Sequence, residues 1–148
     1  MITLKDYLTA SGAYPAREKS PELTPELLGN AEELLKRVNA LLADLGITKA
    51  HVTSGFRPSA ANAAIANASK TSHHQRCHAI DILDDKDQTI AKKLLDDADK
   101  NKQNSLLAKH GLYMEHPQHT IGKRSNWIHW QDVPPGSKSL VFKLKLTI

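Results

Sequence analysis

The sequence predicts an α+β protein in which a small antiparallel sheet packs against two or three helices. A long amphipathic stretch runs from Thr24 to Leu45, and short alternating apolar runs at Ala79–Leu83, Leu112–Glu115 and Trp127–Gln131 have the period of strands. The charged but periodic stretch Asp87–His110 separates the first two of these runs. At 148 residues the chain is long enough to bury a proper core. We therefore expect a single domain over residues 1–148, with its core at roughly 25–135.

The composition excludes several classes of protein. Hydrophobic residues make up 40% and charged residues 24% of the chain, which is ordinary for a globular protein. The single cysteine excludes an intramolecular disulfide framework. No apolar run approaches the roughly 18 residues that span a bilayer, so we expect no membrane partner. Residues 1–14 lack the apolar stretch of a signal peptide, and we expect synthesis in the cytoplasm.

The net charge of +4 is spread along the chain without a basic block. This charge favours anionic partners such as cell-wall polymers or nucleic acid, although it is equally compatible with a role in solubility alone. The aromatic content of 5% and the lack of an arginine-dense helix argue against nucleic acid. We expect no nucleic-acid partner.

The N-terminal half contains one well-delimited helix. Leu4, Tyr7 and Leu8 indicate a short docking turn or helix before it. Thr24-Pro25-Glu26 has the N-cap hydroxyl, the proline and the acid of a helix start. Gly46 marks its end. Between them one broad apolar stripe follows helical spacing: Leu27, Leu28, Ala31, Leu34, Leu35, Val38, Leu41, Leu42 and Leu45.

The remaining elements are short. Residues 49–54 are expected to form a strand that ends at Gly55, and the alanine-rich residues 60–68 a helix followed by a polar loop at 67–72. The stretch Asp87–His110 is expected to be helical, with a break near residues 101–104. The strands Leu112–Glu115 and Trp127–Gln131 are expected to pair antiparallel. The alternating tail 140–146 is expected to be an edge strand protected by lysines.

The stretch Ser72–Asp81 has the densest concentration of potential metal ligands. It holds three histidines, the one cysteine and one carboxylate within ten residues, and zinc accepts all three of these ligand types. On the strand that begins at Ala79, Asp81 shares a face with Ala79 and lies opposite Ile80 and Ile82. Asp81 is therefore a candidate ligand.

Three protein ligands are the usual minimum for a catalytic zinc. His74 is close enough along the chain to fold back beside Asp81, and the third ligand is expected from a distant segment, with His129 as the candidate. A competing His/Cys site pairs His74 with His78, or His73 with Cys77, each four residues apart. The strand that begins at Ala79 argues against a continuous helix through these residues.

These residues resemble a known family. The pattern Ser72-x-His74-x-x-x-x-Ala79-x-Asp81, followed by Trp127-x-His129, is similar to that of the zinc D,D-peptidase family, peptidase M15. Its members include D-alanyl-D-alanine carboxypeptidases and phage L-alanyl-D-glutamate endolysins. Residues 54–58 with Asn62, and residues 111–117, resemble two further motifs of the family. One departure is Cys77, which occupies a position where most members have glycine.

The resemblance implies a D,D-peptidase/hedgehog-like fold with one Zn²⁺ per chain, held by His74, Asp81 and His129. It implies that Glu115 is the general base and that Arg57 and Ser72 bind substrate. His116 and His119 are weaker alternatives for the base. The alternative role for Arg57, in place of substrate binding, is a structural salt bridge.

The resemblance also implies the activity. We expect zinc-dependent hydrolysis of an amide bond in peptidoglycan stem peptides or cross-links, of D,D-carboxypeptidase or L-alanyl-D-glutamate endopeptidase type. A monomeric phage-like enzyme, reaching the wall after lysis or as part of a virion, fits this expectation. The alternative is a catalytically inactive, zinc-containing cell-wall binding module. Cys77 is expected to be buried rather than nucleophilic, whereas Trp127 and Trp130 are equally suited to the core and to a ligand-binding floor.

Overall fold

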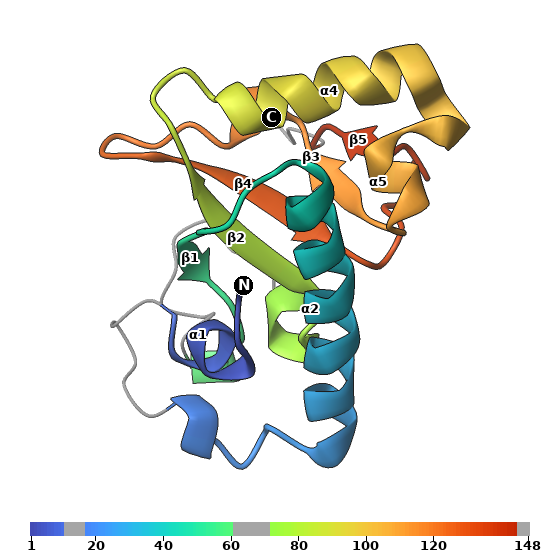
Figure 1. Cartoon of the computed structure of the whole chain (residues 1–148). Helices are drawn as coiled ribbons and strands as arrows, with labels where there is room; N and C mark the ends of the chain where they lie inside the picture. The colour runs from blue at the N-terminus through green and yellow to red at the C-terminus, as the bar shows by residue number, and fades with distance from the viewer. Residues whose placement is uncertain (11–16, 61–71, 145–148) are drawn as a thin grey trace.

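The computed structural model describes residues 1–10, 17–60 and 72–144, and its centre is a five-stranded sheet with the strand order β1-β2-β4-β3-β5 (Figure 1). The strands are β1 Val52–Ser54, β2 Ala79–Asp84, β3 Tyr113–Glu115, β4 Asn126–Gln131 and β5 Val141–Phe142. The longest pairing joins β2 to β4 over six residues.

The sheet is mixed rather than wholly antiparallel as the sequence had indicated. The pairs β1–β2, β2–β4 and β3–β4 are antiparallel, as expected for β3 and β4, but β3 pairs with β5 in parallel. The reason is topological. Both edges of β4 are occupied, by β2 and β3, and the chain that turns back after β4 pairs with the outer edge of β3; being antiparallel to β4, it runs in the same direction as β3.

Four α-helices accompany the sheet in the described part of the chain: α1 Leu4–Thr9, α2 Pro25–Asp44, α4 Thr89–Asn101 and α5 Leu106–Lys109. Helix α2 confirms the predicted start and end. The Thr24 hydroxyl accepts a hydrogen bond from the Leu27 N–H, and Gly46 after the helix has a φ of 71°. A short 3-10 helix over Lys102–Asn104 accounts for the predicted break before α5. The described residues also include the 3-10 helices η1 Arg17–Lys19, η2 His73–Arg76 and η4 Pro117–His119.

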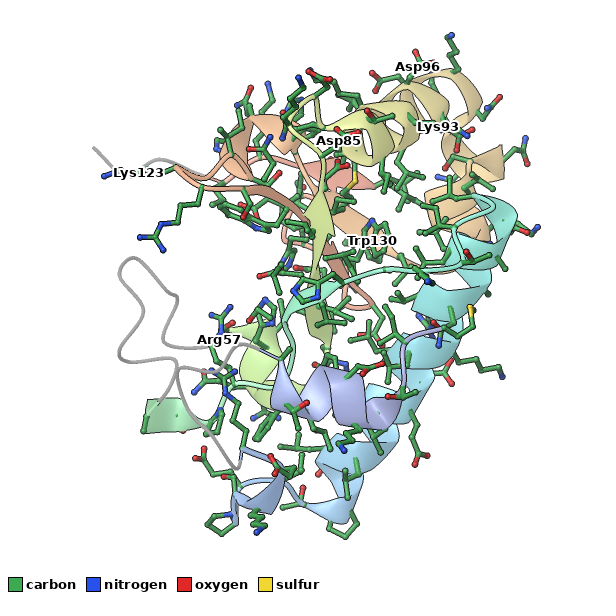
Figure 2. The ribbon with its side chains drawn as sticks, turned by 60° about the vertical axis from the view of Figure 1, so that its left-hand side comes forward. Arg57, Asp85, Lys93, Asp96, Lys123 and Trp130 are labelled. Carbon is green, nitrogen blue, oxygen red and sulfur yellow. The ribbon has the colours of Figure 1, made fainter. Side chains whose placement is uncertain are left out.

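One face of the sheet forms the core with the helices. Ile80, Ile82, Ile128, Trp130 and Met114 are buried in one cluster with apolar residues of α2, α4 and α5. Figure 1 shows α2 running along the sheet and α4 crossing one end of it, and in the turned view of Figure 2 Trp130 lies in the interior. Because side chains alternate along a strand, Asp81 and His129 project from the other face. The predicted α+β fold is confirmed.

Several element boundaries differ from the prediction, those of β2, β3 and β4 by one residue each. Helix α4 starts at Thr89 rather than Asp87, because β2 extends to Asp84, whose carboxylate accepts hydrogen bonds from the N–H groups of Ile90 and Ala91. The first strand is limited to Val52–Ser54 and the last to Val141–Phe142. The predicted helix at 60–68 and the end of the predicted tail strand lie largely outside the described residues. Among the described helices, none has the length and apolar character needed to cross a membrane.

Candidate metal centre

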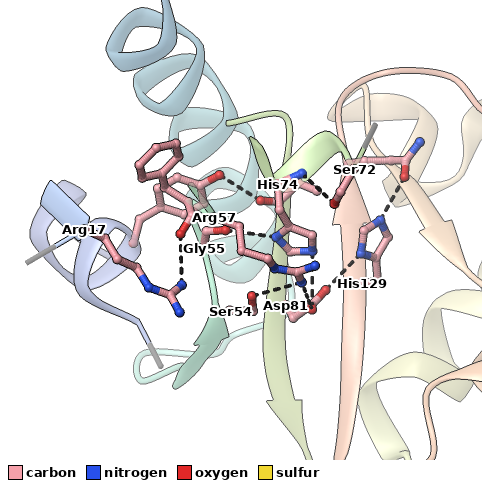
Figure 3. A network of polar contacts seen from close by, with 12 residues as sticks. Arg17, Ser54, Gly55, Arg57, Ser72, His74, Asp81 and His129 are labelled. Atoms are coloured by element: carbon pink, nitrogen blue, oxygen red, sulfur yellow. Dashed lines mark hydrogen bonds and ion pairs between the residues drawn. The ribbon is translucent and has the colours of Figure 1, made fainter. Parts of the chain in front are cut away.

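Three elements bring His74, Asp81 and His129 together. His74 lies in η2, Asp81 in β2 and His129 in β4, and one potential ligand atom from each lies within 4.8 Å of the other two (Figure 3). Among the described residues this is the one such group of three. The candidate ligand set from the sequence is therefore assembled in space.

The strand register aligns this group with Glu115. Asp81 pairs with Ser54 on one side and with His129 on the other. Tyr113 and Met114 pair with Gln131 and Trp130, so continuation of that register sets Glu115 opposite His129. Glu115 in turn pairs with Phe142. The result is one row of side chains across all five strands and on one face of the sheet: Ser54, Asp81, His129, Glu115 and Phe142.

His74 is fixed by contacts to its ring and to its backbone. Its Nδ1 lies 3.0 Å from the carbonyl oxygen of Gly55, its N–H donates to the Ser72 hydroxyl at 3.2 Å, and its carbonyl accepts from the Arg57 N–H at 3.1 Å. A carbonyl can only accept, so Nδ1 carries the proton. The lone pair of Nε2 then faces Asp81 Oδ2, 3.4 Å away.

His129 is oriented by Gln131, a residue that the sequence analysis did not single out. The Gln131 amide nitrogen donates to the Val133 carbonyl at 2.7 Å, and Gln131 Oε1 lies 2.8 Å from His129 Nε2. Because Oε1 is an acceptor, Nε2 of His129 must donate. In the neutral ring, Nδ1 of His129, 2.9 Å from Asp81 Oδ1, then carries the lone pair, whereas in the protonated ring Nδ1 donates to Asp81. The sequence signal that could have identified Gln131 is its position two residues after His129, which puts both side chains on the same face of the strand.

With both rings neutral, three acceptor atoms lie within 4.8 Å of one another, an arrangement that favours a cation between them. Two imidazole nitrogens and a carboxylate oxygen match the ligand chemistry of zinc, and second bonds that fix ring orientation are typical of metal-ligating histidines. Burial lowers the pKa of His129, but the Asp81 hydrogen bond and charge outweigh this and raise it, so a metal ion would have to displace the proton from this ring. Burial opposes ionisation of Asp81, yet both histidines hold its pKa far below the usual range.

Arg57 lies beside the candidate ligands. Its Nη2 is 3.2 Å from the Ser54 hydroxyl and 3.8 Å from Asp81 Oδ2, and the residue is 8% exposed. Burial lowers its pKa, whereas the Asp81 charge raises it. Arg17 donates to the carbonyl of the preceding residue, Phe56, at 3.0 Å. The loop that carries Arg57 is therefore anchored to α1, η1 and His74 (Figure 3).

Glu115 has the environment of a proton acceptor at the edge of the site. It is half-buried, and burial raises the pKa of its carboxyl group. The His129 charge lowers this pKa and the Asp81 charge raises it further. The alternatives for the base lie elsewhere. His116 accepts from the Gln118 N–H at the start of η4, and the partly exposed His119 contacts the Gln118 side chain.

The competing His/Cys site does not form. His78 Nδ1 is 2.8 Å from Asp132 Oδ1, and Cys77 is fully buried, with its pKa raised to about 12 by burial. Cys77 adopts a left-handed conformation, with φ 60° and ψ 33°, which explains why glycine suits this position. Of the two tryptophans, Trp130 is in the core and Trp127 is half-exposed on the face of His129.

The fold and site define an α+β protein with a candidate His-Asp-His metal centre and a neighbouring carboxylate. The family model of Peptidase M15 matches residues 13–130, well over half of the chain. The chain belongs to the Peptidase M15 family, which is a family of peptidases and is zinc-dependent in general. Searches of curated proteins and of solved structures found no significant match.

Proposed function

We propose that this protein is a zinc-dependent peptidase that hydrolyses an amide bond in peptidoglycan stem peptides or cross-links. The observation that carries the proposal is the row in which Asp81, His129 and Glu115 stand side by side on three neighbouring strands. It supplies two candidate metal ligands and a candidate base at adjacent positions, and His74 completes the ligand set.

In this proposal His74 Nε2, His129 Nδ1 and Asp81 hold one zinc ion per chain. When bound, zinc acts as a Lewis acid that polarises a carbonyl group and lowers the pKa of water. Gly55 and Gln131 keep the two imidazoles in the tautomers that present these nitrogens.

Glu115 acts as the general base. Its carboxylate accepts a proton from the water that attacks the amide carbonyl, and it returns a proton to the amine nitrogen as the C–N bond breaks. A partly buried carboxylate with a raised pKa is suited to both steps, because its pKa is shifted toward neutral pH.

Arg57 and Ser72 orient the substrate. A guanidinium binds a carboxylate through two parallel hydrogen bonds, and stem peptides offer free carboxylates. The Ser72 hydroxyl already accepts the His74 N–H, so it links substrate position to ligand position. The finer expectations, D,D-carboxypeptidase or L-alanyl-D-glutamate endopeptidase type and action as a monomer after lysis or within a virion, remain part of the proposal.

The test compares the wild type with Glu115→Gln and His129→Ala, using Glu32→Gln, an exposed acid on α2, as the matched control. We expect about one zinc per chain in the wild type and both glutamate variants, and loss of zinc in His129→Ala. Release of new amino groups from purified peptidoglycan should fall by about 10²–10⁴-fold in Glu115→Gln and be unchanged in Glu32→Gln. Mass spectrometry of the released fragments identifies the bond.

Full activity of Glu115→Gln would remove the proposed base. A wild type that binds zinc and the wall polymer but releases no amino groups would instead support a cell-wall binding module.

A further inference from the structure

A cavity of about 700 Å³ adjoins the candidate metal centre on the side away from Arg57. Two of its lining residues touch His129 directly. Gln131 is hydrogen-bonded to the ring, and the Phe142 ring contacts it edge-on with centroids 6.1 Å apart. Since Arg57 contacts Ser54 at the β1 end of the row and Phe142 lies at the β5 end, a substrate bound across the row would extend from one to the other.

The walls of this cavity come almost entirely from beyond the family-matched region. That match ends at residue 130, and every described lining residue except His73 follows it in the chain. The cavity is therefore built mostly by residues outside the matched region.

The chemistry of the lining selects a type of ligand. Pro135, Phe142 and Leu144 provide apolar walls, Lys143 is an exposed cation, and no acidic side chain is among the described lining residues. The volume lies in the range of small-ligand sites, which combine apolar walls with a few polar groups that fix orientation.

We propose that this cavity is a substrate subsite for a peptide segment that presents an apolar side chain beside a free carboxylate, and that Lys143 binds the carboxylate. This inference rests on the proposed function. In stem peptides the alanine methyl group beside the α-carboxylate of the isopeptide-linked glutamate has this chemistry. The subsite and Arg57 then hold two carboxylates of one substrate on opposite sides of the metal centre.

The test uses two soluble stem pentapeptides that differ only in whether the glutamate α-carboxylate is free or amidated. Lys143→Glu reverses the proposed charge, and Gly136→Trp fills the cavity, since a Cβ at Gly136 meets nothing within 4 Å. The matched controls are Lys93→Glu, an exposed lysine on α4 (Figure 2), and Gly29→Trp, at an equally open glycine of α2.

We measure kcat and KM for each peptide, and calorimetric Kd in a Glu115→Gln background so that binding is read without cleavage. We expect Lys143→Glu to raise KM and Kd about fivefold for the free-carboxylate peptide, the scale of one exposed charge pair, and to leave the amidated peptide unchanged. Gly136→Trp should raise both values for both peptides.

If KM and Kd of Lys143→Glu and Gly136→Trp equal those of Lys93→Glu and Gly29→Trp, the proposed subsite is wrong. A wild type that cleaves neither peptide would contradict the proposed function, and calorimetry would still decide the subsite. A preference for the free carboxylate that disappears in Lys143→Glu supports it, whereas no binding, or equal binding of the two peptides, rejects it.

Discussion

At the scale of single residues, Gln131 determines which nitrogen of His129 faces the candidate metal position. Its amide is held by Val133, so its oxygen is directed at His129 Nε2. Loss of such an orienting partner typically lowers metal affinity by about 10–100-fold. We expect this loss in Gln131→Leu and a smaller one in Gln131→Glu, which retains an acceptor.

Zinc affinity measured by competition with a chelator checks this expectation. Thermal unfolding of the metal-free variants serves as the control, because Gln131 is buried and its replacement also affects packing. An unchanged zinc affinity in Gln131→Leu would show that the tautomer of His129 is set by other contacts.

At the scale of elements, the turn between η2 and β2 depends on the left-handed Cys77. This conformation costs a non-glycine residue about 1–2 kcal/mol, and the buried thiol offsets part of the cost by packing. We expect Cys77→Gly to lie within about 1 kcal/mol of the wild type, since relief of strain and loss of packing oppose each other. Cys77→Val should cost more than about 2 kcal/mol, because a β-branched side chain tolerates this region worst.

Urea unfolding of the two Cys77 variants measures these free energies. The zinc content of each reports whether His74, three residues earlier, keeps its position. A fully stable Cys77→Val variant would show that the turn can relax to another conformation.

A second element-scale contact joins the ends of α2 and α5. Asp44 accepts hydrogen bonds from Lys109 at 2.9 Å and from His110 at 2.6 Å, and these two bonds lower its pKa. The folded state therefore holds the Asp44 proton less tightly than the unfolded chain does. The resulting stabilisation is complete above the ordinary aspartate pKa and is lost as the pH falls through the lowered one.

Asp44→Asn should consequently be less stable than the wild type at neutral pH, and the difference should vanish in acid. Urea midpoints across the acid range test this, with Asp96→Asn as a control that removes a surface ion pair within one helix. A difference that persists below the lowered pKa would assign the effect to the shape of the side chain rather than to its charge.

The sequence predicted those elements whose signals are local. Helix α2 has both caps and a continuous apolar stripe, and β2 and β4 alternate clearly. The sequence indicated an edge strand in the tail but not its parallel pairing with β3, because alternation specifies neither the neighbour of a strand nor its direction. The three candidate ligands followed from the ordered motif, whereas Gln131 did not, because its role depends on an amide orientation that packing decides.

At the scale of the whole molecule, the candidate ligands connect three separate elements, so metal should stabilise the fold. A ligand at 100 times its Kd adds about 2.7 kcal/mol, which corresponds to about 5–10 °C in a protein of this size. We expect a chelator to lower the thermal midpoint of the wild type by this amount. The His129→Ala variant should not respond, and a wild type that is equally insensitive would contradict a high-affinity site.

The row across the sheet links metal binding to strand alignment. A displacement of β4 by one residue against β2 would turn His129 toward the helices and Ile128 or Trp130 toward Asp81, because the side-chain period of a strand is two. Such a misaligned chain would keep its hydrogen-bonded ladder but would not assemble the candidate metal ligands. A metal ion bound at the candidate centre would therefore stabilise the one alignment in which the strand ladder and the candidate ligands are formed together.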